Sequence, residues 1–557
     1  MRNTKWILIL LAIHCGRAGS LTLPNAGELM PPAPLDLPAA QRPSLDIRSE
    51  PAKVAAPDVQ ADHLKIVVKR LTLDGAKAVP ADLAMKSCGF VAGQAYALSE
   101  LRIMAVCIER NYQELGYPVA RVHLPAQNVS EGVIRMGVAE GQYGQVLVRN
   151  RSQVSGDLLS DMLQEIKTGD VVRTTGLETT LLLLSDLPGV QVKSALVPGA
   201  TLGSSDLMVD VLPGQRVTGS IDADNGGNYY TGAWRAGATL FFNEPAGQGD
   251  VASLRLLTSG DGLNYLRAAY QLQLGQARVG ASFSSLEYAL GQGLQNLLAN
   301  GTARNIGFFG SYPLLRSRNE NMFLGASFES KRFEDRMDSV SSVREKAVHV
   351  ASASLTADHR DDWGQGGLNA YVLTASSGSI IQQNLAALTM DAATANSNGH
   401  FNKFAFNASR TQSLSPSWVL YAGLNGQWAS KNLDASEKMR LGGMSSVRAY
   451  PESEAYGDEG YVLNLEARWL IPNRLAKLPG QFQLVGFVDS GRVKINKNPW
   501  NADVNQRQLS GAGLGLNWAA WDRYQVRMTY AHKLGKEVAQ AAPDAQDRFW
   551  LQAIKSF

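Results

Sequence analysis

The side chains that usually carry out catalysis or bind metals are scattered along this chain of 557 residues without a recognisable spacing. Its seven histidines form no His-Glu-x-x-His motif, and no Gly-x-Ser-x-Gly sequence presents a serine nucleophile. A phosphate-binding Gly-x-x-x-x-Gly-Lys-Ser/Thr loop is also absent from the sequence. Asp222 and Asp224 resemble the start of a calcium loop, but no glutamate follows at its twelfth position. We therefore expect no enzyme, no cofactor and no metal.

The first 20 residues have the pattern of a secretory signal peptide. Arg2 and Lys5 supply positive charge, residues 6–13 are apolar, and small residues follow at positions 18–20. The apolar run is too short for a membrane anchor, so we predict cleavage at positions 18–20 and export from the cytoplasm. The net charge of +3 is too small to predict a nucleic-acid partner.

Two cysteines, Cys88 and Cys107, remain after the predicted cleavage. In an oxidising compartment an even number of cysteines usually pairs, so a disulfide between them is favoured. Such a bridge closes a loop of about 20 residues and contributes about 3 kcal/mol by restricting the unfolded chain. The alternative is two buried free thiols.

Residues 21–63 form a proline-rich linker that contains eight of the 22 prolines. A segment of this composition cannot bury a core, and we expect an extended chain, with a short helix around 26–30 as an option. Whether that helix plugs a pore is left open by the sequence.

Two small α/β units follow, at 64–141 and 142–215, and each has the order strand, helix, helix, strand, strand. The first unit has a predicted strand at 64–73, a helix at 99–114 capped by Ser99, and strands at 120–124 and 133–139. The second repeats this order with strands at 145–149, 190–196 and 207–212 and helices at 158–166 and 177–184. A three-stranded sheet with an open edge can accept a partner strand, so the repeat is either purely structural or a peptide-binding module.

From residue 216 to 557 the helical pattern disappears and apolar residues alternate with polar ones. Three stretches show it best: Trp234, Ala236, Ala238, Leu240 and Phe242; Leu266, Ala268, Tyr270, Leu272 and Leu274; and Tyr461, Leu463, Leu465, Ala467 and Trp469. Strands of about 10 residues with one apolar face are typical of transmembrane β-barrels, and the aromatic residues near their ends match an interfacial girdle. A soluble β-sandwich also alternates, but the signal peptide and the length of the region favour a barrel. At about 20 residues per strand and connection, we predict an outer-membrane barrel of about 16 antiparallel strands.

Several motifs in the two units and at the start of the barrel match one family in order. The matching residues are Tyr112, Gly116, Tyr117, Leu124, Pro125, Gln127, Gly132, Glu140 and Gly141 in the first unit; Asp186-Leu187-Pro188-Gly189-Val190 and Pro198-Gly199 in the second; and Asp224, Asn225, Gly227, Thr231, Gly232, Arg235, Asn243, Pro245, Gly247, Gly249 and Asp250 at the barrel entrance. With these residues the chain resembles the outer-membrane transporters of two-partner secretion (TpsB type), the haemolysin secretion/activation family that includes ShlB, FhaC and HecB. The resemblance covers nearly the whole chain after the signal peptide.

Two further motifs resemble signatures of the wider superfamily of such barrels. Val447-Arg448-Ala449-Tyr450 is similar to the tip of a loop that folds into the barrel, here around 441–456, and Phe487-Val488-Asp489-Ser490-Gly491 is similar to its F-x-D-x-G strand motif. The resemblance implies that Arg448 and Asp489 pair and hold the loop in place; the alternative is two unrelated charges in a polar lumen. The C-terminal Phe557 resembles the signal for barrel assembly.

The resemblance implies a function. The α/β units would be periplasmic POTRA domains that receive an unfolded exoprotein (TpsA type), such as a haemolysin or adhesin, by strand addition. The barrel would pass it to the cell surface of a Gram-negative bacterium without nucleotide hydrolysis. Outer-membrane lipid, periplasmic chaperones and the barrel-assembly machinery would be the other partners. An assembly factor for other barrels is the alternative, followed by a porin or an outer-membrane enzyme.

Two residues depart from the family pattern. Ala449 stands where glycine is commoner, so the loop tip would be strained if its backbone needs a positive φ. Lys555 would face lipid near the chain end unless its ammonium group reaches the membrane surface.

Overall fold

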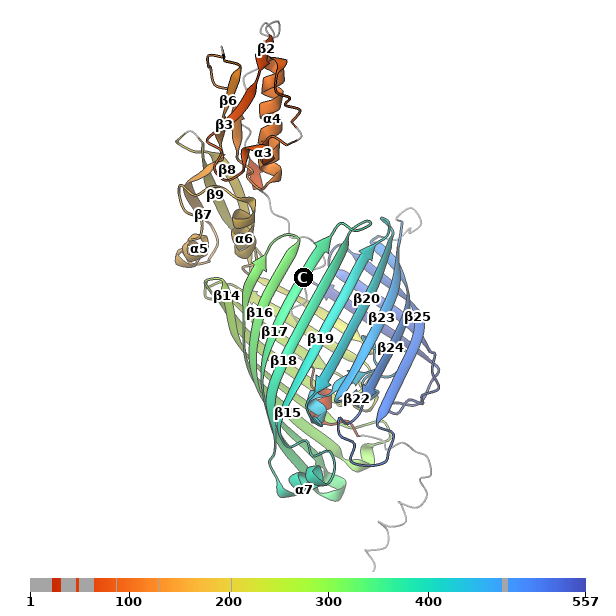
Figure 1. The fold of residues 1–557 in the computed structure, drawn as a ribbon. Helices are drawn as coiled ribbons and strands as arrows, with labels where there is room; N and C mark the ends of the chain where they lie inside the picture. Colours follow the sequence, from red (N-terminus) through yellow and green to blue (C-terminus); the bar gives the residue numbers. More distant parts are fainter. Residues whose placement is uncertain are drawn as a thin grey trace, which may run out of the picture.

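The computed structural model describes residues 23–31, 47–49, 65–86, 88–129, 131–201, 203–472 and 479–557. The predicted signal peptide lies outside these residues, as does most of the predicted linker. Within the described residues, no helix is both long and apolar enough to cross a membrane. Two α/β units stand above one end of a large barrel (Figure 1).

The barrel is a closed antiparallel sheet of sixteen strands, each paired with its sequence neighbour in the wall. This confirms the predicted fold and strand number. The strands are β10 (Val217–Asp224), β11 (Arg235–Asn243), β12 (Val251–Thr258), β13 (Leu263–Leu274), β14 (Ala277–Ala289), β15 (Ala299–Arg316), β16 (Glu320–Met337), β17 (Ser342–Asp361), β18 (Gly367–Gln382), β19 (Gly399–Ser413), β20 (Trp418–Ala429), β23 (Glu459–Ile471), β24 (Gln481–Lys494), β25 (Gln506–Ala520), β26 (Tyr524–Lys533) and β27 (Asp547–Ser556).

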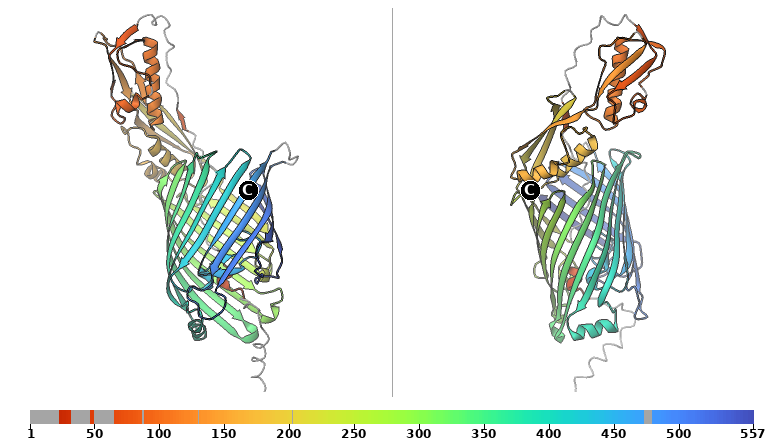
Figure 2. Two further views of the ribbon diagram at one scale, coloured as in Figure 1. Left: turned by 45° about the vertical axis from the view of Figure 1, so that its right-hand side comes forward. Right: turned by 60° about the vertical axis from the view of Figure 1, so that its left-hand side comes forward.

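The first and last strands close the barrel over a short seam. β10 and β27 pair from Ser220 with Ser556 to Asp224 with Gln552, whereas β16 and β17 pair along their whole length. Phe557 continues the seam, because its backbone exchanges two hydrogen bonds of 3.0 Å with Gly219. The C-terminus is therefore part of the wall (Figure 2).

Several strands are longer than the predicted 10 residues. β15, β16 and β17 have 18, 18 and 20 residues and extend beyond the others at the end remote from the α/β units (Figure 1). Outward residues follow the predicted alternation: Leu266, Tyr270 and Leu274 are exposed to the surroundings of the barrel. Extra strand length of this kind lies outside a bilayer core, since about 10 tilted residues cross it.

The inner wall is not polar throughout, which the alternation did not predict. At the remote end, inward apolar side chains form a buried cluster: Leu257, Leu263, Tyr265, Leu286, Tyr288, Phe333, Val348, Val350, Ile380 and Phe401. Ala26 and Met30 from the N-terminal segment belong to the same cluster. Apolar residues are favourable there because another part of the chain covers them.

The first α/β unit contains β2 (Lys65–Val68), β3 (Arg70–Asp74), α3 (Ala81–Ala84), β4 (Gln94–Ala97), α4 (Leu98–Glu114), β5 (Arg121–His123) and β6 (Val133–Ala139). The single strand predicted at 64–73 is divided at Lys69: β2 pairs with β4, and β3 pairs with β6. Ser99 is not the helix cap. The helix begins at Leu98, and the Glu100 carboxylate accepts a 2.6 Å hydrogen bond from the backbone of Ala97.

The second unit contains β7 (Gln142–Asn150), α5 (Gly156–Leu163), α6 (Thr174–Ser185), β8 (Val190–Pro198) and β9 (Ser204–Pro213). Its sheet has a fourth strand, β1 (Ile47–Ser49), which comes from the segment predicted to be linker. β1 runs parallel to β8, with Arg48 opposite Ala195. An open edge was expected in a three-stranded sheet; in this four-stranded sheet the β8 edge is occupied by the chain itself.

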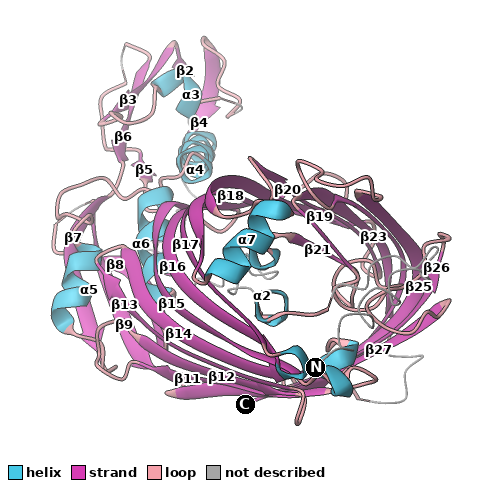
Figure 3. Ribbon diagram, turned by 90° about the horizontal axis from the view of Figure 1, so that it is seen from below, coloured by secondary structure: helices cyan, strands magenta, loops and turns pink. Residues whose placement is uncertain are grey.

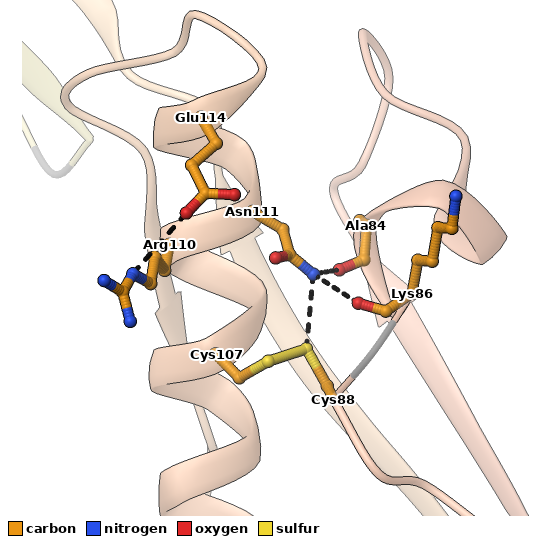
Figure 4. Close-up of a disulfide and its surroundings, with 7 residues drawn as sticks. All are labelled: Ala84, Lys86, Cys88, Cys107, Arg110, Asn111 and Glu114. Atoms are coloured by element: carbon orange, nitrogen blue, oxygen red, sulfur yellow. Dashed lines mark hydrogen bonds and ion pairs between the residues drawn. A yellow bond between two sulfur atoms is a disulfide. The ribbon is translucent and has the colours of Figure 1, made fainter.

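A disulfide joins Cys88 to Cys107 and fastens the segment after α3 to the middle of α4 (Figure 4). The Cα atoms are 5.7 Å apart. Asn111, one turn further along α4, donates hydrogen bonds to the carbonyl oxygens of Ala84 at 2.7 Å and Lys86 at 2.8 Å. The bridge and the amide hold the same segment, so they stabilise the first unit jointly.

We expect the double variant Cys88→Ser/Cys107→Ser to destabilise the first unit by about 3 kcal/mol, because the unfolded segment regains the entropy of its loop. Proteolysis of the full-length protein in outer-membrane fragments, as a function of urea, measures this loss. Asn111→Ala is the matched control, since it frees the same segment but leaves the bridge; its loss should be about 1 kcal/mol. An unchanged urea midpoint in the double variant would contradict the stabilising role.

Candidate functional site: the loop and helix inside the barrel

Three segments, from two distant parts of the sequence, lie inside the remote half of the barrel (Figure 3). They are the helix α2 (Ala26–Leu29), the short turn η5 (Ala435–Glu437) and the hairpin of β21 (Met439–Leu441) and β22 (Ala455–Gly457). The last two belong to the connection between β20 and β23. We call its residues 442–454 the inward loop.

The inward loop is attached to the wall through Arg448. The guanidinium donates to both carboxylate oxygens of Asp489, at 2.8 and 2.7 Å, and the Arg448 backbone N–H donates to the same carboxylate at 3.0 Å. The remaining guanidinium nitrogen donates to Glu466 at 2.7 Å. The charged plane also lies 3.5 Å from the ring centroid of Phe487. Asp489 is fully buried, so a bidentate pair of this geometry is a strong contact.

Strand alternation brings the partners of Arg448 together. Asn464 and Glu466 on β23 lie opposite Asp489 and Phe487 on β24, so all four share the inner face. Asn464 donates to Asp489 at 2.7 Å and to the backbone of Ser446 at 2.8 Å. Asn464 and Glu466 are the polar residues that alternate with Leu463, Leu465 and Ala467 in this strand. Because inward polar residues of adjacent strands are neighbours, that alternation was the signal that could have identified them.

The loop tip is packed against two glycines of the wall. Val447, Ala449 and Tyr450 are fully buried. A Cβ atom on Gly491 would lie 2.2 Å from Leu441 of the hairpin. One on Gly511 would lie 2.4 Å from the Ala449 methyl group. Ala449 does not have a positive φ, so the condition under which alanine would be strained here is not met, and Gly511 provides the space for its side chain.

The helix α2 is held by polar contacts at both ends. The Ala26 backbone N–H donates to Asp335 on β16 at 2.7 Å. Arg440 on β21 donates to the carbonyl oxygens of Gly27 at 3.3 Å and Met30 at 2.9 Å. The structure therefore answers the question left open by the sequence: the 26–30 segment lies inside the pore and contacts the hairpin of the inward loop.

The η5 turn beside α2 is fixed by buried ion pairs with the wall. Asp434 pairs with Lys346 at 2.8 Å, and Glu437 pairs with Lys331 at 2.9 Å and with Lys403 at 2.6 Å. These carboxylates reach three different strands of the wall. The remote half of the lumen is filled by α2, η5 and the inward loop together.

A cavity of about 1380 Å³ occupies the half of the lumen nearer the α/β units. Its lining extends from Asp186 of the second unit to Pro31, next to α2, and includes the ion pairs of Arg235 with Asp224 and Arg255 with Asp222. Asp222 and Asp224 thus hold arginines. Among the described residues there is no group of three or more potential metal ligands.

The second unit is fixed to the barrel on two sides. On one side Asp186, at the end of α6, accepts two hydrogen bonds from Arg316 at 2.8 and 2.7 Å, and Glu178 pairs with Arg318 at 3.0 Å. On the other side the Ser155 backbone N–H donates to Gly247 in the β11–β12 turn at 2.8 Å. Arg278 lies 3.9 Å from the Asp186 carboxylate, so several charged side chains meet at this contact between the second unit and the barrel.

In the first unit one titratable group is strongly perturbed. Tyr112 is fully buried on α4, and burial raises the pKa of its hydroxyl to about 12, with a further contribution from the adjacent Glu140 carboxylate. Glu140 in turn accepts backbone hydrogen bonds from Lys77 at 2.6 Å and Ala78 at 2.7 Å. Tyr112 and Glu140 of the sequence motif therefore hold the unit together from inside.

Lys555 is exposed on β27, and its ammonium group lies 5.6 Å from the ring centroid of Tyr524 on β26. The two residues are opposite each other in the wall, and the chain ends two residues after Lys555, near the end of the barrel that carries the α/β units (Figure 2). An aromatic residue and a lysine at this level match a membrane interface.

A closed barrel with α/β units at one opening and a latched loop inside defines a class of outer-membrane protein that handles polypeptides. The model for the haemolysin secretion/activation protein ShlB/FhaC/HecB matches residues 203–518, and the model for the POTRA domain of ShlB type matches residues 66–141. The chain belongs to the haemolysin secretion/activation family ShlB/FhaC/HecB.

Three relatives match the chain over most of its length and over most of their own. It is 27% identical over 476 residues to the heme/hemopexin transporter protein HuxB of Haemophilus influenzae strain 86-028NP, covering 84% of this chain and 82% of HuxB. It is 24% identical to the outer membrane transporter CdiB of Dickeya dadantii, covering 74% of each chain. It is also 24% identical to the hemolysin transporter protein ShlB of Serratia marcescens, covering 74% and 73%.

Solved structures share the fold. CdiB from Escherichia coli superposes with a TM-score of 0.67 at 20% identity, covering 91% of this chain and 93% of that one. BamA from Haemophilus ducreyi lacking POTRA domains 1–3 gives 0.54 at 14% identity, covering 89% and 100%. With the family established, the chain is an outer-membrane transporter that secretes an exoprotein, and its α/β units lie in the periplasm. The end that holds α2 and the inward loop therefore faces the cell exterior.

Proposed function

We propose that the exoprotein enters as an extended strand on the β8 edge of the second unit, passes through the cavity, and leaves once α2 and the inward loop have moved. The observation that carries this route is the N-terminal segment of the chain itself. Its β1 lies on the β8 edge, and its Pro31 lines the cavity beside α2. One continuous polypeptide thus already connects the edge with the pore.

Strand addition to β8 fits a cargo that varies in sequence, because it uses backbone hydrogen bonds. A cargo strand needs the same edge as β1, so the two compete for it. We further propose that Arg448 and Asp489 hold the closed state, and that folding of the cargo outside drives transport in place of nucleotide hydrolysis. Outer-membrane lipid surrounds the barrel; Phe557, periplasmic chaperones and the barrel-assembly machinery serve its insertion.

A cysteine pair tests the route. Arg48 and Ala195 are opposite each other on β1 and β8, so Arg48→Cys/Ala195→Cys can lock β1 onto the edge. We expect the oxidised double variant to lose at least about nine-tenths of exoprotein secretion, measured in the culture medium of a strain that lacks the native gene, because the edge cannot open.

The two single-cysteine variants are the matched controls and should secrete normally. Binding of an N-terminal exoprotein fragment to the purified transporter should fall in parallel with secretion. Full secretion by a double variant whose cross-link is demonstrated would exclude the β8 edge as the entry site.

A further inference from the structure

The carboxylate of Glu454, at the end of the inward loop, is fully buried and accepts hydrogen bonds from two other elements. Arg507 on β25 donates to it at 2.8 Å. The backbone N–H of Gln540 donates at 2.9 and 3.0 Å, and that of Ala541 donates at 3.0 Å. Gln540 and Ala541 belong to residues 534–546, which connect β26 to β27 and which we call the terminal loop. Glu454 therefore joins the inward loop to the terminal loop.

The terminal loop is organised around this contact. Lys533, just before it, donates to Asp544, and this hydrogen bond lowers the pKa of the Asp544 carboxyl group. Asp544 also accepts from the Ala539 backbone at 2.8 Å. The Lys533 ammonium group lies 4.7 Å from the ring centroid of Tyr450 at the tip of the inward loop. The base of the terminal loop thus meets the inward loop at a second place, next to the loop tip.

Loss of the Glu454 contact is unfavourable on both sides. The Arg507 guanidinium is itself buried, and the two backbone N–H groups of the terminal loop point to the carboxylate. If the inward loop moved alone, Arg507 would keep only its contacts with the terminal loop, to Glu537 and to the Val538 carbonyl oxygen, both at 3.1 Å. The two backbone donors would lose their partner, which costs more than each bond contributes when formed. If both loops moved together, the backbone contacts would be retained and only those to the wall would break.

We propose that Glu454 is a positioning residue that fastens the terminal loop to the inward loop, so that both leave the pore mouth as one unit during secretion. This rests on the proposed role of Arg448 in holding the closed state. The terminal loop adjoins β27 at the barrel seam, so release of the inward loop would also free the outer end of that strand.

Cysteine accessibility measures the coupling. Ala542 is buried in the terminal loop. In an Ala542→Cys background on intact cells, we expect Glu454→Ala to accelerate reaction with a membrane-impermeant maleimide about tenfold or more, because several hydrogen bonds to a charged acceptor are lost. Arg448→Ala should also accelerate it, although Arg448 is not among the residues that contact the terminal loop in the described part of the chain. Planar-bilayer conductance of the same variants reports whether the inward loop has left the pore.

Glu537→Gln is the matched control, because Glu537 is a half-exposed terminal-loop residue that also pairs with Arg507, at 3.1 Å. Glu537→Gln should change the labelling rate by no more than about twofold. Raised conductance in Arg448→Ala with unchanged labelling of the introduced thiol at position 542 would overturn the coupling. If Arg448→Ala leaves the conductance unchanged, the proposed role of Arg448 in holding the closed state is wrong. Glu454→Ala then tests the link between the two loops alone, and an unchanged labelling rate in this variant would overturn that link. Heat-modifiable migration in electrophoresis shows that each variant has folded.

Discussion

Replacing Arg448 with alanine should abolish secretion of the exoprotein while the barrel still inserts into the outer membrane. The change removes the bidentate contact with Asp489, the contact with Glu466 and the stacking on Phe487. It also leaves the buried Asp489 without its cation, and breaking such a pair costs about 3 kcal/mol. The inward loop then lacks a defined resting position. Secretion is measured as exoprotein in the culture medium, and insertion as heat-modifiable migration.

Two variants separate the lock from general damage to the lumen. Arg468→Ala is the matched control, because Arg468 also pairs with Glu466, at 2.7 Å, but does not contact Asp489 in the described contacts; it should secrete normally. Arg448→Lys keeps the charge but loses the planar double contact, so we expect an intermediate effect. Normal secretion by Arg448→Ala would show that transport does not need the contact between the two charges.

The second large effect is expected at the joint between the second unit and the barrel. Asp186→Arg replaces the acceptor of Arg316 with a like charge and places that charge near Arg278. We expect the joint to weaken by about 2 kcal/mol, since both groups of the original pair are mostly buried. The connection from β9 to β10 is only residues 214–216, so the unit would then swing about a short link. Secretion should fall at least about tenfold.

Interdomain distance distinguishes loss of positioning from loss of folding. Spin labels at the exposed positions Gln164 and Asn319 should give one narrow distance in the wild type and a broad distribution in Asp186→Arg. The charge swap Asp186→Arg/Arg316→Asp should narrow the distance distribution in part, because Arg278 still repels the arginine introduced at position 186. Arg149→Ala, which breaks an exposed pair at 4.0 Å within the unit, is the control. Full secretion with a broad distance distribution would mean that the angle of the unit is irrelevant to transport.

The features that could be read from the sequence are those in which local pattern and tertiary environment agree. The alternating pattern identified outward residues such as Leu266 and Tyr270, because the outer face of every strand contacts lipid whatever its neighbours are. It failed for inward residues such as Phe333 and Phe401, which lie in the buried cluster that Ala26 and Met30 complete, and no local pattern reveals a distant segment of that kind. β1 was missed for the same reason: three residues of a proline-rich segment become a strand only because β8 offers an edge.

The candidate site divides along the same line. Arg448, Asp489 and their motifs were recognised from a resemblance, whereas Glu454 and Trp550 were not singled out at all. Trp550 donates to the Arg448 carbonyl oxygen at 2.7 Å from a strand that is 102 residues away. Contacts between residues so far apart in sequence form only when the barrel closes. The sequence predicts that a barrel forms, but it does not predict which side chains then become neighbours. Ala449 shows the converse: its backbone has no positive φ, and its methyl group fits because Gly511, on another strand, has no side chain.

If α2 leaves the lumen during secretion, as proposed, its attachment to β1 also determines how the pore closes again. Residues 32–46 join them, and a chain of this length spans at most about 55 Å. A helix that has been pushed out of the lumen therefore remains within this distance of β1, which raises its effective concentration at the lumen. Its return is an intramolecular event, independent of how many transporters the membrane holds. Even contacts as few as those of α2 can then reseal the channel after each molecule has passed.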